Sequence, residues 1–370
     1  MATSRLHQLS EQGQSVWIDF LSRPLLRDGD LERMLRDDAV VGVTSNPTIF
    51  QKAISQGDAY DEQIREVLER SEDAKEVFLE LAVRDVQDAC DLLGDTHERT
   101  GGVDGFVSIE VDPHLAYDRD ATIAEARRLS ELVDRPNVYV KIPATEPGLG
   151  AIEETIAAGI PVNVTLIFGL GRYRAVAEAY LRGLERLVES GGDAAKVPSV
   201  ASFFVSRVDT EADKRLDKLG GHDDLRGRLA IANARLAYQA FKEIFAGERW
   251  EALRAAGARP QRCLWASTSV KDERYRDTMY VEELIGPDTV DTMPPETIAA
   301  FQDHGEVAPT LERDIDGARD LLERLREAGI DYDDVIDTLE REGVQKFTDS
   351  FQQLLDDVKS KRDALAGAPT

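Results

Sequence analysis

A single lysine interrupts an otherwise apolar β-like segment of the chain. The stretch NVYVKIPATEPG, residues 137–148, contains the run Val138–Ile142, and Lys141 lies inside it. Burying an ammonium ion is costly unless it is paired with an opposite charge or loses its proton. A neutral amine in a dry pocket is a nucleophile that can form a Schiff base with a carbonyl substrate. The alternative interpretation is a buried ion pair of Lys141 with Glu110 or Asp19.

Two carboxylates lie in similar segments and could carry protons for such a lysine. Asp19 ends the run VWID, and Glu110 lies in VSIEVD. A Schiff-base cycle moves protons when the carbinolamine forms, when it dehydrates and when a carbon–carbon bond breaks, and carboxyl groups can serve in each step. The residue types therefore predict covalent chemistry on a carbonyl compound.

The segments that carry these residues alternate with helical patterns. Strands are predicted at residues 15–20, 39–46, 105–111, 137–144, 160–168, 198–207, 261–268 and 288–293. Helical periodicity follows the third, fourth and fifth of them, at 120–134, 148–159 and 171–190. Eight strands alternating with helices indicate an α/β fold with a parallel sheet, and the count favours a (β/α)8 TIM barrel. A doubly wound sheet is the alternative.

Alternate positions along each strand differ in chemistry, and side chains of a strand point alternately to its two faces. One set is almost entirely aliphatic and suits the outer wall under the helices. In the seventh strand this reasoning places Leu264 and Ala266 outside, with Trp265 and Ser267 inside. Since barrel active sites form at the carboxyl ends of the strands, we expect a site there rather than mutually satisfied core polar groups. The polar set gathers Asp19, Asn46, Glu110, Lys141, Asn163, Thr165 and Ser202.

The domain organisation that we expect is one barrel domain over residues 1–370. Helical insertions are expected at about 51–104 and 208–260, with a helical C-terminal extension at about 306–370 whose charges form a solvated face. The net charge is −26, from 71 acidic and 45 basic residues. Such a surface repels nucleic acid and anionic membranes and reflects solubility or salt adaptation. With no apolar run near 18 residues, a soluble cytoplasmic protein is predicted.

Metal and cofactor motifs are not recognisable in the chain. GLGRYR and PGLG complete neither GxGxxG nor a P-loop, and Cys90 and Cys263 form neither a disulfide framework nor a CxxC pair. The five histidines also lack metal-ligand spacing. They are His7, His97, His114, His222 and His304.

The order of several longer motifs resembles the transaldolases, a family of class I Schiff-base barrel enzymes. The motifs are GVTSNPTIF, VSIEVDPHLAYD, VYVKIPATEPGLGAI, IPVNVTLIFGLGRY, ASFFVSRVD, LWASTSVKD and DTMPPETIAAFQDHG. The length and inserts resemble the longer bacterial branch. The resemblance implies transfer of a dihydroxyacetone unit between ketose phosphates (sedoheptulose 7-phosphate, fructose 6-phosphate) and aldose phosphates (glyceraldehyde 3-phosphate, erythrose 4-phosphate) in the pentose phosphate pathway. It also implies no metal or organic cofactor, and a monomer or a homodimer.

The resemblance implies catalytic roles for four residues. Lys141 falls on the Schiff-base lysine of the family, and Asp19 on the acid/base of carbon–carbon cleavage. Glu110 and Thr165 fall on the pair that holds and activates a catalytic water.

Substrate-binding roles follow in the same way. The groups that orient the dihydroxyacetone unit correspond to Asn46, Asn163 and Ser202, and the main phosphate ligand corresponds to Arg207. Many members carry Ala-Ser-x-Arg after the seventh strand. Here the stretch is WASTSVKD, in which Ser267 matches but the cation is Lys271, which binds phosphate as a point charge without the fork of arginine.

One aromatic position bears on the type of reaction. Phe204 shares the inward parity of Ser202, and related hydrolytic aldolases carry a tyrosine at the matching place. A phenyl ring offers no proton, so the sequence favours a transferase. The alternatives are a hydrolytic class I aldolase that releases dihydroxyacetone and a catalytically silent sugar-phosphate binding barrel.

Overall fold

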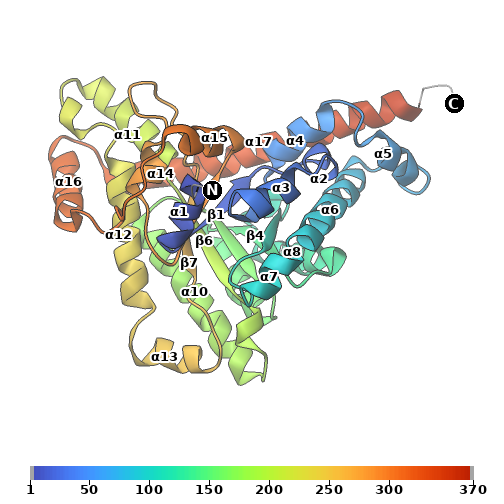
Figure 1. Ribbon diagram of the computed structural model, residues 1–370, viewed down its shortest axis with the longest axis horizontal. Coiled ribbons are helices and arrows are strands. Elements are labelled where there is room, and N and C mark those ends of the chain that lie inside the picture. The colour runs from blue at the N-terminus through green and yellow to red at the C-terminus, as the bar shows by residue number, and fades with distance from the viewer. Residues whose placement is uncertain (1–3, 367–370) are drawn as a thin grey trace.

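A closed barrel of parallel strands, numbered β1 to β8 in chain order, forms the centre of the protein (Figure 1). The structure is a computed structural model that describes residues 4–366. The pairing of β8 with β1 closes the barrel, which confirms the predicted (β/α)8 fold and excludes a doubly wound open sheet. All eight predicted strands are present. They span Gln14–Asp19, Val40–Thr44, Phe106–Glu110, Val138–Pro143, Val162–Ile167, Ser199–Phe204, Arg262–Ala266 and Thr289–Met293.

Helices surround the barrel and fill the expected insertions. The predicted helices at 120–134, 148–159 and 171–190 are α8 (Arg119–Val133), α9 (Glu146–Ala157) and α10 (Leu170–Glu189). Those before β3 are α1 (Arg5–Glu11), α2 (Arg23–Arg27), α3 (Asp30–Asp37), α4 (Pro47–Ser55), α5 (Asp61–Leu68), α6 (Ala74–Leu92) and α7 (Gly94–Arg99). Those after β6 are α11 (Ser206–Leu219), α12 (Leu229–Ile244), α13 (Gly247–Ala255), α14 (Met279–Glu283), α15 (Pro295–His304), α16 (Ile315–Glu327) and α17 (Tyr332–Ala366).

The turn after β4 is held tightly by local hydrogen bonding. Thr145 caps α9, because its Oγ1 accepts a hydrogen bond of 3.1 Å from the amide of Gly148. A Cβ on Gly148 would lie 2.2 Å from the carbonyl oxygen of Pro143, so only glycine allows the helix to start this close to the strand. The strand that carries Lys141 therefore ends in a fixed conformation.

Aromatic rings fill the amino-terminal part of the barrel. Tyr139 stacks on Phe106 with ring centroids 4.1 Å apart and lies 6.1 Å from Trp17. Gly42 of β2 faces Trp17, and a Cβ on Gly42 would lie 2.5 Å from the indole ring. These rings close the barrel below the polar residues, which leaves only the carboxyl ends of the strands for a site.

The inward and outward faces of β7 are the reverse of those predicted. β6 and β7 pair with Ser202 beside Leu264 and Phe203 beside Trp265. Because laterally paired residues point to the same face, Leu264 lies inside the barrel and Trp265 lies outside, in edge contact with Phe203 at 6.2 Å. The predicted orientation of β7 was wrong. In this register Arg262, which is half-buried, is paired with Asp104 at 2.9 Å.

The last helix lies across the carboxyl end of the barrel. α17 packs against α4, α5, α6 and α11 and also contacts β5, and in Figure 1 it runs along the upper side of the molecule (red) beside α4. A Cβ on Gly343 of α17 would lie 3.1 Å from Leu166 and 3.3 Å from Phe168. Glycine therefore lets this helix approach the barrel closely.

We expect Gly42→Ala to destabilise the protein, because the new methyl group requires Trp17 to move within a closely packed layer. The expected loss is ~1–3 kcal/mol in the free energy of unfolding, typical of overpacking. Urea denaturation followed by fluorescence measures it. Gly171→Ala in α10 is the matched control, since nothing lies within 4 Å of the place that its new methyl group would occupy. Equal stability of the two variants would contradict the close packing at Gly42.

Candidate active site

The predicted polar residues converge on one cavity of about 760 Å³ at the carboxyl ends of the strands. The predicted residues that line it are Asp19, Asn46, Lys141, Thr165, Ser202, Phe204, Arg207, Ser267 and Lys271. Glu110 and Asn163 are hydrogen-bonded or ion-paired to members of this set. The structure therefore brings together every site residue that the sequence predicted, from five of the eight strands and from the segments that follow β2, β6 and β7.

Lys141 lies at the centre of the site and is paired. Its side chain is 8% exposed, and Nζ is 3.2 Å from Oε2 of Glu110. Nζ also donates a hydrogen bond of 3.0 Å to the carbonyl oxygen of Ser45. The parallel register of β3 and β4 places Glu110 beside Lys141. The ion-pair interpretation and the nucleophile interpretation are compatible, because a proton can pass from the ammonium to the adjacent carboxylate.

Burial alters the acidity of Glu110. Desolvation raises the pKa of this carboxyl above its ordinary value, and the attraction of Lys141 opposes the rise. A carboxyl with a raised pKa is a better proton acceptor than an exposed one, so it is suited to take a proton from a neighbouring group and return it.

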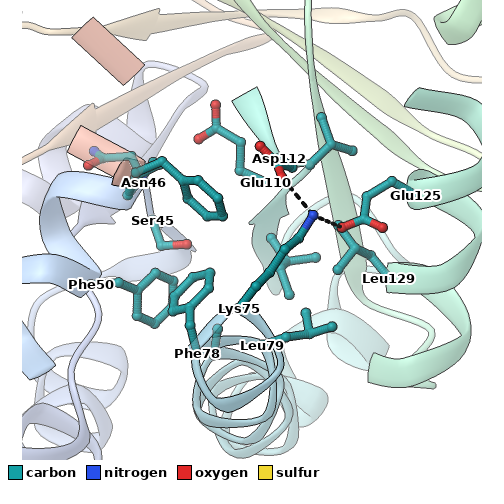
Figure 2. Close-up of a pocket in the computed structure, with 15 residues that line it drawn as sticks. Ser45, Asn46, Phe50, Lys75, Phe78, Leu79, Glu110, Asp112, Glu125 and Leu129 are labelled. Carbon is teal, nitrogen blue, oxygen red and sulfur yellow. Dashed lines mark hydrogen bonds and ion pairs between the residues drawn. The ribbon is translucent and has the colours of Figure 1, made fainter. Parts of the chain in front are cut away.

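Figure 2 shows the side chains around a separate pocket that Glu110 also lines. This second, smaller cavity lies between the barrel and α4, α6, α8 and α17, and its lining is largely apolar, with Phe50, Phe78 and Leu79 among it. Lys75 enters it between two acids, 2.6 Å from Asp112 and 4.0 Å from Glu125. Lys75 is thus paired with these acids, and Lys141 supplies the opposite charge for Glu110.

Asp19 ends β1 and is held by two threonines. Thr44 donates a hydrogen bond of 2.7 Å to Oδ1 of Asp19, and the hydroxyls of Thr44 and Thr292 are 2.6 Å apart. Desolvation raises the pKa of Asp19, while Lys141 and the Thr44 hydrogen bond lower it. The result is a carboxyl of fixed orientation that can exchange a proton with a bound hydroxyl group.

An amide and two serines form an ordered wall. Asn163 donates a hydrogen bond of 3.1 Å to Oγ of Ser108, and Ser202 donates one of 2.7 Å to Oδ1 of Asn163. Oγ1 of Thr165 is buried and has no hydrogen-bond partner in residues 4–366, so it can hold water or substrate. Asn46 accepts a hydrogen bond of 3.1 Å from the amide of Ile49 and so caps α4.

The cationic end of the cavity lies at β6, β7 and the loop beyond. Arg207 is in the first turn of α11, and desolvation lowers its pKa. Ser267 reaches the site through a left-handed backbone conformation, φ 59°, and its Oγ is 2.9 Å from that of Ser206. Lys271 is exposed and donates a hydrogen bond of 2.6 Å to Ser269. An anionic group can bind between these cations.

Several residues in the site carried no functional prediction. They are Thr44 and Thr292, which hold Asp19, the Ser45 carbonyl that accepts from Lys141, and Phe347 of α17. Phe347 lies 5.8 Å from Nζ of Lys141, measured to its ring centroid. The C-terminal extension that contains Phe347 was expected to present a solvated face. The spacing of apolar Leu339 and Phe347 about Gly343 is the sequence signal that this face is buried.

The fold and site define a (β/α)8-barrel enzyme with a buried lysine–carboxylate centre. The chain belongs to the transaldolase/fructose-6-phosphate aldolase family, whose sequence profile matches residues 16–358. It is 54% identical to a transaldolase of Frankia alni over 353 residues, 95% of each chain. It is 52% identical to transaldolase 2 of Streptomyces coelicolor over 371 aligned positions, covering 98% of this chain and 99% of the relative. The resemblance predicted from the motifs is confirmed.

Membrane-spanning helices and metal clusters are both absent from the described part of the chain. In residues 4–366, the helices are too short or too polar to cross a membrane. Over the same range, no cluster of three or more His, Cys, Asp or Glu side chains is able to hold a metal ion.

We expect Lys141→Met to destabilise the protein more at pH 8 than at pH 5. Without the ammonium, the pKa of Glu110 is raised further, so the folded state holds the proton to a higher pH than the unfolded state does. Stability is then lost as pH rises above the ordinary glutamate pKa of about 4.3. The loss at pH 8 is about 3–5 kcal/mol, as for other broken buried pairs.

Urea denaturation at both pH values measures this difference. Lys214→Met is the control, because Lys214 is an exposed lysine of the same cavity, 2.8 Å from Glu211. An equal loss for Lys141→Met at pH 5 and pH 8 would show that Glu110 does not carry the unpaired charge.

Proposed function

We propose that this protein is a transaldolase that transfers a dihydroxyacetone unit from a ketose phosphate to an aldose phosphate through a Schiff base on Lys141. The observation that carries the proposal is Lys141 buried 3.2 Å from Glu110, inside a cavity that also holds Asp19 and Arg207. Relatives named transaldolase that are 52–54% identical over nearly the whole chain support it.

The first half of the reaction cleaves the donor. The ammonium of Lys141 gives a proton to Glu110, and the free amine attacks C2 of the ketose phosphate. The carbinolamine loses water, assisted by proton transfer from Glu110 to the departing hydroxyl, and a protonated imine remains. Asp19 takes the proton of the C4 hydroxyl. The C3–C4 bond then breaks, its electron pair passes to the iminium to form an enamine, and the aldose phosphate leaves.

The second half runs in reverse with another aldose phosphate. C3 of the enamine attacks the aldehyde carbon, Asp19 returns its proton to the new oxygen, and the iminium is regenerated. Water held by Glu110 and Thr165 adds to C2, and collapse of the carbinolamine releases the new ketose phosphate and Lys141. The iminium nitrogen is the electron sink throughout, so the cycle balances without another reagent.

The two ends of the cavity bind different parts of the substrate. Asn46, Asn163 and Ser202 orient the hydroxyls of the dihydroxyacetone unit, while Arg207 and Lys271, with Ser267, bind the phosphate. The donors are sedoheptulose 7-phosphate and fructose 6-phosphate, and the acceptors are glyceraldehyde 3-phosphate and erythrose 4-phosphate. We place the enzyme in the cytoplasmic pentose phosphate pathway, as a single-domain barrel acting as a monomer or a homodimer.

Borohydride reduction in the presence of fructose 6-phosphate is expected to leave a three-carbon adduct on Lys141 alone. Peptide mass mapping locates it. Lys141→Arg is expected to form no adduct and to lose roughly 10³-fold or more of its activity, because a guanidinium keeps its charge and is not a nucleophile. An adduct on another lysine, or none during turnover, would overturn the Schiff-base assignment.

Phe204→Tyr is expected to shift the reaction from transfer toward release of free dihydroxyacetone. Phe204 lines the cavity and packs on Phe168 with ring centroids 5.1 Å apart, so the present side chain excludes water and donates no proton. A phenol there can protonate the enamine, and we expect release to rise by roughly tenfold or more.

The assay compares donor consumption with and without erythrose 4-phosphate. The unmodified enzyme is expected to consume little fructose 6-phosphate without an acceptor. Equal turnover under both conditions would favour the hydrolytic aldolase instead.

A further inference from the structure

The guanidinium of Arg207 is held by aromatic rings rather than by anions. Within residues 4–366 it makes no salt bridge, and its Nη1 is buried without a hydrogen-bond partner. Its Cζ lies 5.0 Å from the ring centroid of Phe204 and 5.9 Å from that of Phe347. A cation over an aromatic face is attracted by the ring without being neutralised, so it remains able to bind an anion.

The same cavity contains competing partners for this cation. Asp19 and Glu110 both act electrostatically on Arg207, and each has its own partner, Thr44 for Asp19 and Lys141 for Glu110. Arginine has a long flexible stem, and a bidentate pair with a carboxylate is strong. Something therefore has to keep the guanidinium away from these acids when no substrate is bound.

Phe347 lies where its ring can keep the guanidinium of Arg207 away from these acids. Its ring centroid is 5.8 Å from Nζ of Lys141 and 5.9 Å from Cζ of Arg207, and the residue is 7% exposed. It lies on a face of α17 whose residues recur at intervals of three and four and line the cavity. That face comprises Leu339, Glu342, Gly343, Lys346 and Phe347. The close approach of Gly343 to Leu166 and Phe168 fixes the height of this face above the barrel.

We propose that Phe347 is a positioning residue for the phosphate-binding arginine: its ring keeps Arg207 directed to the phosphate end of the cavity and apart from Lys141 and its carboxylate. The inference rests on the proposed function, since it assigns the donor phosphate to Arg207. Without the ring, Arg207 turns away from the phosphate end of the cavity and pairs with a carboxylate, which withdraws the phosphate ligand.

The test compares two phenylalanines of the same helix. Phe347→Ala removes the ring in the cavity. Phe351→Ala removes an equally large buried ring one turn further on, where Phe351 is 4% exposed and packs on Phe78 at 5.6 Å, outside the catalytic cavity. Calorimetry measures the Kd of inorganic phosphate, kinetics give the KM of fructose 6-phosphate, and borohydride trapping with dihydroxyacetone measures Schiff-base formation without a phosphate.

Phe347→Ala is expected to raise both the Kd and the KM by about tenfold, the value of one charged hydrogen bond lost from the phosphate. Dihydroxyacetone is still trapped on Lys141, and Phe351→Ala leaves both constants unchanged. Phe347→Leu, which keeps apolar volume, is expected to raise the Kd about threefold. If the alanine variant does not fold, this leucine variant decides the question.

An unchanged phosphate Kd in a folded Phe347 variant would overturn the inference, and so would an equal rise in Phe351→Ala. The phosphate measurement requires no turnover. Failure to trap dihydroxyacetone on Lys141 in the unmodified enzyme would therefore count against the proposed function alone.

Discussion

The buried ion pair between Lys141 and Glu110 is the interaction on which the rest of the site depends. Removing two charges from water costs several kcal/mol per ion, and close approach with further hydrogen bonds recovers it. The register of β3 and β4 supplies the approach, and the Ser45 carbonyl supplies a hydrogen bond. The side chains of Lys141 and Glu110 are only 8% and 7% exposed, so little water reaches the pair. The same desolvation raises the pKa of Glu110.

The strands and the segments that follow them contribute different groups to the site. Asp19, Glu110 and Lys141 are on strands β1, β3 and β4, whose backbones are held by neighbours on both sides. Groups that act on reacting atoms need such rigid placement. The two cations that we propose as phosphate ligands, Arg207 and Lys271, lie on a helix turn and on a loop after strands. A phosphate far from the reacting carbons tolerates this looser support.

Much of this arrangement could be predicted from the sequence because strand periodicity is local. Alternation placed Asp19, Glu110 and Lys141 inside the barrel without any knowledge of contacts. It misplaced β7, because both alternating sets of that strand contain large apolar side chains, Leu264 in one and Trp265 in the other, and the pairing with β6 decides which set faces inward. Thr44 and Phe347 were not predicted as site residues, for a related reason. Their importance lies in their distance from Asp19 and Lys141, and no local pattern encodes a distance between remote segments.

The position of α17 after all eight strands has a consequence for synthesis. All eight strands, with Asp19, Glu110 and Lys141, precede residue 332, where this helix begins, yet Phe347 of this helix lines the cavity beside Lys141. A nascent chain on the ribosome can therefore close its barrel before it has an enclosed reaction chamber. A chain that terminates just before α17 would leave Lys141 without the ring of Phe347 beside it. The cavity is therefore enclosed only after α17 has been translated.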